Sequence, residues 1–291
     1  LTSGGCVAFH ENPDGSTYID FIKEHRVNYI SGVPNQAAEF LKHAREKEIL
    51  FPGLKAFRVG ATIVPDVLRK SIQERLTPNL YIGYGSNEAG AITMAPPALV
   101  RAIPGVVGKV VPGMTVDIID DDGQSLASNK VGRIRLKSPG LISGYFDDAA
   151  ETALVFRDGW LYTGDLAEFT SEGALIRHGR ADDVMIWDGI NIYPAEIENA
   201  LLRHEAVAEV AAFPVNTIAH GGIPTGAIVA KSAVSEQELL AHCRSLLGVH
   251  APLGLMFVPK LPRNAMGKVL KNELIRLFLQ RGAKKSSDRQ P

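Results

Sequence analysis

Four short segments of the chain combine glycine with side chains that can bind phosphate, ribose or a divalent cation. The first, residues 83–88 (GYGSNE), directly follows an apolar run. Glycine lets the backbone approach a flat or anionic ligand, and a carboxylate at the carboxyl end of a strand can hold a divalent ion. The segment therefore predicts a ligand contact at Glu88. For this segment alone, an ordinary glycine turn with a solvated glutamate is the favoured alternative.

The second segment, residues 159–166 (GWLYTGDL), carries Asp165. An aspartate held on a tight turn can accept hydrogen bonds from both hydroxyls of a ribose, as acidic residues do in dinucleotide-binding folds. For the segment alone, the alternative is a β-turn aspartate that bonds its own backbone.

The third segment begins at Arg180 and contains Gly189. The arginine is a candidate partner for phosphate or ribose, and the glycine permits a close backbone approach. Further along, Glu196 and Glu198 are expected to complement the N-terminus of a helix.

The fourth segment, residues 262–269 (PRNAMGKV), precedes a predicted helix at 272–279. Its Gly267-Lys268 pair resembles the end of an NTPase phosphate loop. However, the first glycine of the G-x-x-x-x-G-K pattern is missing, so the spacing does not predict such a loop. For the dipeptide alone, a surface lysine is the alternative.

Composition excludes several classes of partner. The chain holds 32 acidic and 31 basic residues, so no strong overall field attracts nucleic acid or an anionic membrane. Cys6 and Cys243 lie far apart and are expected to be reduced thiols, as is usual in the cytosol. No window approaches the ~18 apolar residues of a membrane span. These observations predict a soluble, cytoplasmic protein, and they do not indicate an oligomeric state.

The elements that must position these residues fall into three regions. In the first third, helix signals at 16–24, 34–48 and 65–75 alternate with strand signals at 27–30, 56–59 and 80–82, which is typical of βαβ units and a parallel sheet. From Gly105, short strands at 116–119 and 132–136 favour an antiparallel sheet or small barrel. After Gly179, helices at 194–202 and 235–247 with strands at 207–213 and 227–231 predict a small α+β domain.

Taken together, the order and spacing of the four segments resemble the adenylate-forming superfamily of acyl-CoA and aryl-CoA ligases, peptide-synthetase adenylation domains and luciferases. The resemblance runs over essentially the whole chain and includes residues 131–134 followed by 144–146. It implies an α/β plus α+β fold. Residues 1–181 would form part of a large domain with a βαβ sheet and a small antiparallel β-barrel region, 182–282 a mobile lid domain, and 283–291 a disordered tail.

The resemblance also implies a nucleotide site. Its expected members are Gly60 and Ala61 along the adenine, Tyr84 stacked on it, Gly85 in the same glycine-rich segment, Asn87 at the α-phosphate, Glu88 linked to Mg²⁺, Asp165 at the ribose, and Arg180 at the ribose or a phosphate. Two positions depart from the family pattern. Asn87 replaces a usual threonine, and its amide can donate the same hydrogen bond. Trp187 replaces a commonly basic residue, so no charge contact is expected there.

Lys268 matches the lysine that, in the family, bridges the α-phosphate and the attacking carboxylate. Attack of a carboxylate on phosphorus brings two anions together, and a fixed ammonium with Mg²⁺ stabilises the charge where it develops. Asp182 matches the hinge and Gly189 the glycine that lines the pantetheine tunnel. The small domain is expected to rotate about Asp182 between the two half-reactions.

The implied activity is AMP-forming activation of a carboxylic acid followed by thioester transfer to coenzyme A, with ATP, Mg²⁺ and CoA as the small-molecule partners. An adenylation unit that loads a carrier protein's phosphopantetheine and a non-catalytic nucleotide-binding module are the alternatives. In the family, the acyl pocket is lined partly by segments that match residues 31–35, the surroundings of Ala61 and residues 89–91. The small side chains at Gly32, Ala61, Ala89 and Gly90 therefore favour a medium or long fatty chain or an aromatic ring over acetate.

The family's serine-, threonine- and glycine-rich loop, which cradles the β- and γ-phosphates, has no match in this sequence. Residues 1–5 (LTSGG) contain a glycine pair but no serine-threonine run. We therefore expect the first part of the large domain to be absent and the chain alone to be catalytically incompetent.

Overall fold

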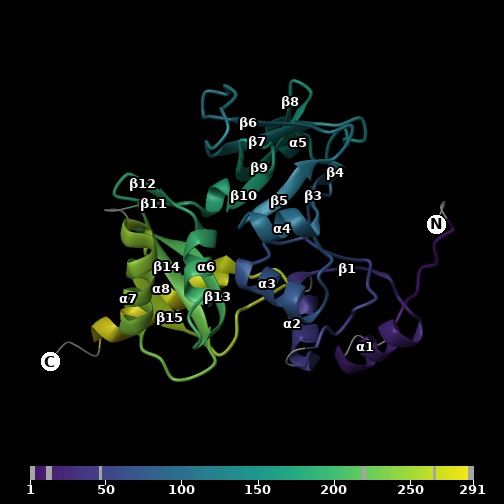
Figure 1. The fold of residues 1–291 in the computed structure, drawn as a ribbon. Helices are drawn as coiled ribbons and strands as arrows, with labels where there is room; N and C mark the ends of the chain where they lie inside the picture. Colours follow the sequence, from purple (N-terminus) through teal and green to yellow (C-terminus); the bar gives the residue numbers. More distant parts are fainter. Residues whose placement is uncertain (1–3, 11–14, 46–47, 218–220, 265–266, 288–291) are drawn as a thin grey trace. The chain divides into compact units, whose positions relative to one another are not determined.

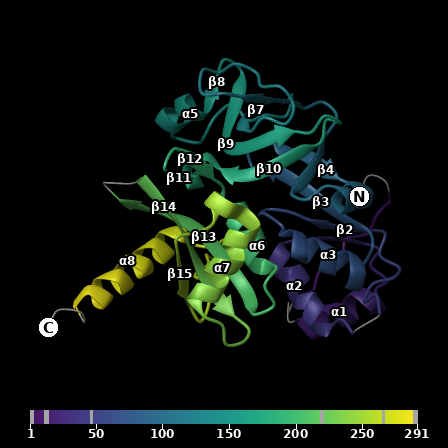
Figure 2. The same cartoon turned by 60° about the vertical axis from the view of Figure 1, so that its left-hand side comes forward.

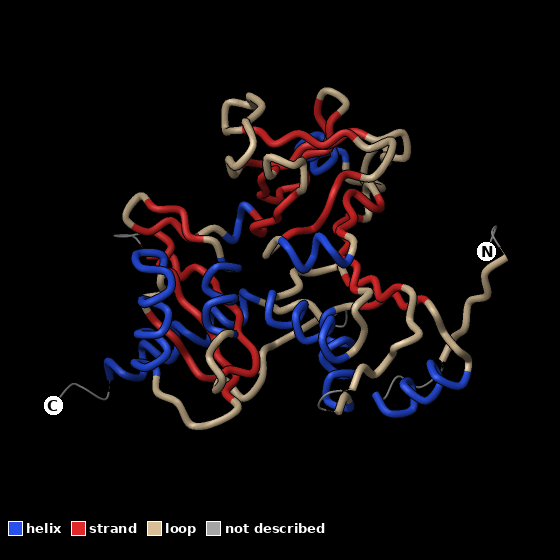
Figure 3. The backbone as a smooth tube through the Cα atoms, in the orientation of Figure 1, coloured by secondary structure: helices blue, strands red, loops and turns tan. Residues whose placement is uncertain are grey.

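The computed structural model describes residues 4–10, 15–45, 48–217, 221–264 and 267–287 (Figure 1). Contacts between Cα atoms divide the chain into two compact units. The first unit comprises Leu1–Thr163 and Ala167–Arg177, and the second comprises Gly164–Leu166 and His178–Pro291. The helices and strands of each unit can be followed in Figure 3.

The first unit opens with three parallel neighbours, β1 (Tyr29–Gly32), β2 (Ala56–Val59) and β3 (Leu80–Ser86). Helices α2 (Pro34–His43) and α3 (Asp66–Arg75) make the crossovers, and α1 (Gly15–Glu24) packs on α2. Alternate strand residues are buried, namely Ile30, Phe57, Val59, Leu80 and Ile82. Because side chains alternate between the faces of a strand, these residues form one apolar face of the sheet. The predicted βαβ sheet is confirmed.

Antiparallel strands complete this sheet in the order β1-β2-β3-β4-β5-β10-β9-β7-β6, with β8 paired to β9. They are β4 (Gly90–Ala95), β5 (Val106–Val110), β6 (Thr115–Ile119), β7 (Gly132–Lys137), β8 (Phe156–Arg157), β9 (Trp160–Phe169) and β10 (Leu175–Arg180). Helices α4 (Pro97–Ala102) and α5 (Ala149–Val155) lie between them in sequence. The predicted antiparallel region is therefore confirmed. It is joined through β4 and β5 to the parallel strands.

One glycine is required for the pairing of β4 with β5. Gly108 has φ of +113°, and a Cβ atom there would lie 1.9 Å from the carbonyl carbon of Met94. No other residue fits so close to a backbone atom, so Gly108 allows the two strands to approach.

The second unit contains a small α+β domain, as predicted. Its elements are the 3₁₀ turn η1 (Ala181–Asp183), β11 (Met185–Trp187), β12 (Ile190–Ile192), α6 (Pro194–Leu202), β13 (Val207–Thr217), β14 (Gly221–Ala230), α7 (Glu236–Leu247), the 3₁₀ turn η2 (Gly248–His250), β15 (Gly254–Phe257) and α8 (Lys271–Ser287). Strands β13 and β14 pair antiparallel, and β14 and β15 pair parallel.

Both faces of this small sheet are covered by helices (Figure 2). Neighbouring strand residues separate into different apolar clusters. Ala212 and Ile228 pack with the buried residues of α6 and α7, whereas Phe213 and Ala227 pack with Leu274 of α8. The period-two alternation of the strands therefore sorts apolar side chains between two cores.

Some predicted boundaries are wrong. The helix predicted over 34–48 ends at His43. The tail expected to be disordered from residue 283 is helical as far as Ser287, because α8 continues through alanine and lysine, which have high helix propensity. Residues 288–291 lie outside the described residues.

Candidate active site

Glu88 lies in the turn between β3 and β4. The phenolic hydroxyl of Tyr145 donates a hydrogen bond of 2.7 Å to its Oε1 atom. The backbone N–H of Ile142 donates to the Glu88 carbonyl oxygen at 3.2 Å. The segment around residues 142–145 therefore fixes both the backbone and the carboxylate of Glu88.

The glycine-rich segment before Glu88 was expected to follow a strand, but it is part of β3 itself. Its glycines allow close backbone contacts. A Cβ atom on Gly60, just after β2, would lie 2.7 Å from the carbonyl oxygen of Gly83. The structure thus brings together two segments that the sequence assigns to the adenine. Ala61 has φ of +69°, which is uncommon for a residue with a side chain.

Tyr84, the expected stacking residue, is 8% exposed. The guanidinium carbon of Arg177 lies 5.6 Å from the centroid of its ring. Asn87 lies in the same turn as Glu88, beyond Gly85. These residues all belong to the first unit.

Asp165 lies within β9 and is 7% exposed, so its expected place on a tight turn is corrected. The reason is the preceding glycine. Gly164 adopts φ of +71° inside the strand, so the glycine that predicted a turn is accommodated within β9. A Cβ atom on Gly164 would lie 2.9 Å from Nη2 of Arg180. The guanidinium therefore lies against the residue adjacent to Asp165.

Arg180 also forms an ion pair of 3.4 Å with Asp182, the expected hinge residue, which is in η1. The second unit thus brings together the predicted ribose ligand, the predicted ribose or phosphate contact and the predicted hinge.

The next residue, Asp183, accepts a hydrogen bond of 2.9 Å from Nζ of Lys271 at the start of α8. Glu198 of α6 interacts electrostatically with both Lys271 and Asp183. Its Oε1 atom accepts a hydrogen bond of 3.0 Å from the backbone N–H of Ala212. Burial raises the pKa of the Glu198 carboxyl, against the opposing effects of Lys271 and of that N–H. The expected role of Glu198 at a helix N-terminus is therefore corrected.

Glu196 lies in the first turn of α6, as expected, and it also contacts a histidine. Its Oε2 atom lies 2.8 Å from Nδ1 of His250 in η2. Both glutamates of the third segment thus connect α6 to other elements of the second unit.

Gly189 forms the turn of the β11–β12 hairpin. Trp187 pairs with Ile190, which leaves Asp188 and Gly189 as a two-residue loop with φ of +50° and +76°. Asp-Gly is a preferred sequence for a turn with two positive φ angles. This hairpin signal was available in the sequence and was overlooked, and it gives Gly189 a structural reason to be glycine.

Lys268 has an exposed side chain in the loop before α8. Its backbone N–H donates to Oδ1 of Asn264 at 2.9 Å, and its carbonyl oxygen accepts from the N–H of Asn264 at the same distance. An isolated β-bridge between Arg263 and Val269 closes the loop.

The residues that could hold Mg²⁺ are few. Among the described residues, no group of three or more histidine, cysteine, aspartate or glutamate side chains could hold a metal ion. Magnesium bound together with substrate phosphates needs only one or two protein carboxylates. Glu88, held by Tyr145, fits that requirement.

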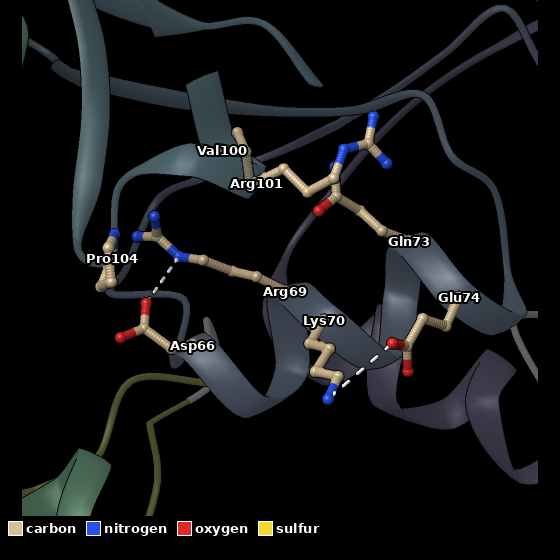
Figure 4. Close-up of a pocket in the computed structure, with 8 residues that line it drawn as sticks. All are labelled: Asp66, Arg69, Lys70, Gln73, Glu74, Val100, Arg101 and Pro104. Atoms are coloured by element: carbon tan, nitrogen blue, oxygen red, sulfur yellow. Dashed lines mark ion pairs between the residues drawn. The ribbon is translucent and has the colours of Figure 1, made fainter. Parts of the chain in front are cut away.

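A cavity of about 340 Å³ lies between α3 and α4 and contains none of these residues (Figure 4). Arg69 lines this cavity. Its guanidinium donates hydrogen bonds to the carbonyl oxygens of Val64 and Val106, each at 2.7 Å. Burial lowers the pKa of this guanidinium, and Asp66 at 3.7 Å partly opposes that shift. These contacts give Arg69 a structural role.

Comparison with known proteins settles the family. Residues 1–146 match the model of the AMP-binding enzymes, and residues 196–268 match that of the AMP-binding enzyme C-terminal domain. The chain belongs to the AMP-binding enzyme family. Among curated AMP-binding enzymes, it is 30% identical to an indoleacetate–CoA ligase of Aromatoleum aromaticum over 287 residues, which are 97% of this chain and 56% of that protein.

Two solved AMP-binding enzymes have the same fold. ATP-bound MatB from Rhodopseudomonas palustris is 27% identical, with a TM-score of 0.84 over 93% of this chain and 54% of that one. The o-succinylbenzoate coenzyme A synthetase MenE from Bacillus subtilis, in complex with ATP and magnesium ion, is 30% identical, with a TM-score of 0.81 over 91% and 55%. The chain thus spans about half the length of the relatives it matches.

No described helix of this AMP-binding enzyme is both long and apolar enough to cross a membrane.

Proposed function

We propose that this chain takes part in the AMP-forming activation of a carboxylic acid and in the transfer of the acyl group to coenzyme A. The observation that carries the proposal is the position of the Arg180 guanidinium, against Gly164 and beside Asp182, one residue from Asp165. An acid for ribose hydroxyls and a cation for phosphate then lie in one compact unit. Curated relatives with the same two regions are CoA ligases.

In the proposed first step, a carboxylate oxygen of the acid attacks the α-phosphorus of ATP, and the bond to pyrophosphate breaks. The ammonium of Lys268 neutralises charge on the carboxylate and on the α-phosphoryl oxygens as the two anions meet. Glu88 would hold Mg²⁺, which would supply a Lewis acid for the phosphates. Tyr145 fixes Oε1 of Glu88 by its hydrogen bond.

The base and sugar are held by the remaining predicted residues. Gly60 and Ala61 offer backbone along the adenine, Tyr84 offers its ring, Gly85 belongs to the same glycine-rich segment, and Asn87 meets the α-phosphate. Asp165 accepts hydrogen bonds from the ribose hydroxyls.

In the proposed second step, the thiol of CoA loses its proton to solvent as its sulfur attacks the acyl carbon, and AMP leaves with the former carboxylate oxygen. Lys268 is needed only for attack at phosphorus, so it can leave the site before the thiol attacks. The small domain, from Asp182 to residue 282, rotates about the hinge at Asp182 between the two steps. Gly189 then lines the path of the pantetheine chain.

For the acid, we propose a medium or long fatty chain or an aromatic ring, because the residues assigned to the acyl pocket include Gly32, Ala61, Ala89 and Gly90. Curated relatives include ligases of indoleacetate, 2-succinylbenzoate and long-chain fatty acids. The free thiols of Cys6 and Cys243 support a reducing, cytoplasmic setting.

The test is AMP release from Mg-ATP with CoA and a panel of fatty and aromatic acids. It is made on this chain and on the longest reading frame that contains it. By analogy with the loss of one charge-stabilising donor, Lys268→Ala is expected to slow adenylation by ~10²–10³-fold without weakening AMP binding. Lys260→Ala, which removes an exposed lysine from the same unit, is the matched control.

Each alternative predicts a different result. Acyl transfer to a phosphopantetheinylated carrier protein but not to CoA would favour a carrier-loading adenylation unit. AMP binding without turnover, with every acid and both thiols, would refute the ligase proposal and favour a nucleotide-binding module.

A further inference from the structure

One arginine connects the loop that carries Lys268 to the small sheet by side-chain hydrogen bonds. Nη1 of Arg263 donates to the carbonyl oxygen of Gly267 at 2.8 Å. Nη2 of the same guanidinium donates to the carboxylate of Glu209 in an ion pair. Arg263 thus joins the peptide group immediately before Lys268 to a strand of the small sheet.

Glu209 is well placed to anchor this contact. It lies on β13, where it pairs with Val229 of β14. Two residues further along the strand, Ala211 is 2% exposed in the core beneath α8. Strand pairing fixes the backbone of Glu209, and its side chain is 44% exposed where it meets the guanidinium of Arg263.

Backbone hydrogen bonds complete the loop. The N–H of Gly267 donates to the carbonyl oxygen of Asn264 at 2.9 Å, and the N–H of Leu270 donates to that of Pro262 at 2.9 Å. Gly267 has φ of +79°, a conformation that favours glycine. Both of these bonds stay within the loop, whereas the guanidinium of Arg263 connects the loop to the sheet.

We propose that Arg263 and Glu209 are positioning residues for Lys268: the guanidinium fixes the Gly267 carbonyl relative to β13, and so fixes the point from which the lysine side chain extends. The proposal rests on the proposed role of Lys268 in adenylation. The ammonium of a lysine lies at the end of a four-carbon side chain. A shift of the lysine backbone therefore moves the ammonium away from the phosphoryl oxygens. Misplacement by about 1 Å can cost about a hundredfold in rate.

The experiment compares the longest reading frame that contains this chain with three variants of it. Arg263→Lys retains the positive charge, but its single ammonium cannot span both acceptors. Glu209→Ala removes the anchor. Arg135→Lys is the matched control, because Arg135 forms an ion pair with Asp117 in the first unit, with side chains 19% and 21% exposed.

Two measurements are made on each protein. Hydrogen exchange of the Gly267 and Lys268 amides reports the loop directly. Exchange is expected to accelerate about tenfold or more in Arg263→Lys and Glu209→Ala, and not in Arg135→Lys. ATP–pyrophosphate exchange reports adenylation and is expected to fall about 10–100-fold, with KM for ATP nearly unchanged.

A third measurement separates positioning from general loss of structure. Thioester formation from supplied acyl-adenylate and CoA requires no attack at phosphorus, so the loop variants are expected to keep it within about threefold. Equal losses in both half-reactions, or unchanged amide exchange, would overturn the proposal.

The exchanged pair Arg263→Glu with Glu209→Arg sharpens the comparison. It restores an ion pair, but a carboxylate at position 263 has no N–H to donate to the Gly267 carbonyl, so adenylation is expected to stay low. Recovery of adenylation would show that the ion pair acts only through stability.

If the unaltered chain and its longest reading frame both lack adenylation, the proposed function fails, and amide exchange still decides whether Arg263 holds the loop.

Discussion

The hydroxyl of Tyr145 and Oε1 of Glu88, separated by 57 positions in the sequence, are joined by a hydrogen bond of 2.7 Å. The ring of Tyr145 packs edge-on against Phe156 with centroids 5.8 Å apart, and its backbone N–H donates to Oγ1 of Thr152 at 2.9 Å. The tyrosine is thus fixed from three sides, and the orientation of the carboxylate follows from it.

Tyr145→Phe should therefore weaken the response to magnesium. The ring and its packing remain, while the hydroxyl that orients Glu88 is lost. Loss of an outer partner of a metal ligand typically costs ~10–100-fold in metal affinity or activity. The measurement is adenylation rate against Mg²⁺ concentration at fixed ATP, with Tyr29→Phe, a change at an exposed tyrosine of β1, as the control. An unchanged magnesium midpoint would contradict the prediction.

Asp165→Ala should weaken AMP binding by about 10–100-fold, because a hydrogen bond to a charged group contributes roughly 1.5–3 kcal/mol. Titration calorimetry with AMP measures the change, and Asp122→Ala removes an exposed carboxylate as the control. A second ligand identifies the contact. 2′-Deoxy-AMP should bind the unaltered chain less tightly than AMP, whereas Asp165→Ala should not distinguish the two nucleotides.

Glu198 should make stability depend on pH. Its folded-state pKa is raised above 4.5 by burial. From pH 4.5 up to the raised value, the folded state holds a proton that the unfolded state has lost, so the free energy of unfolding falls as pH rises. The stabilisation is complete below pH 4.5 and is lost as pH rises through the folded pKa.

Glu198→Gln should remove this slope, which amounts to about 1.4 kcal/mol per unit of pKa difference. Urea unfolding at a series of pH values measures it. Glu205→Gln, at an exposed glutamate of the same unit, should keep the slope. Parallel curves for the two variants would contradict the assignment of the slope to Glu198.

The two thiols should differ in reactivity. Cys243 is fully buried, and burial raises its pKa to about 11, whereas Cys6 is exposed. At pH 8, a chromogenic disulfide reagent is expected to titrate one thiol per native chain and two in denaturant, because the thiolate is the reactive form. Cys6→Ser should leave no rapidly reacting thiol, and a fast reaction in that variant would show that Cys243 is accessible.

The sequence predicted those elements whose apolar residues follow a clear period. Strand β2 and helix α6 lie at the predicted residues because both have clear periodicity and are bounded by turn or proline signals. Strand β9 was not predicted, because its ten residues include a glycine and two acids that read as a loop. Only its pairing with β7 and β10 makes that segment a strand.

The contacts around the site could not have been predicted in the same way. Arg263 and Glu209 are 54 positions apart, and their contact depends on the register of β13 and on the return of the chain after β15. Local propensity carries no information on either. The family resemblance identified Lys268 from its motif, and the residues that hold its loop became evident only from the packing. The chemical roles of the site residues stay predictions.

The membership of Gly164–Leu166 in the second unit has a consequence for recombination between related genes. Residues on either side of this segment belong to the first unit, so the second unit is discontinuous in sequence. A hybrid made by a single crossover at His178 would take Arg180 from one parent and residue 164 from the other. In the present chain, the Arg180 guanidinium lies against Gly164. Any bulkier residue at position 164 in that parent would displace the arginine. Hybrids that cross over before residue 164 or after residue 180 keep the pair together and are the ones expected to retain nucleotide binding.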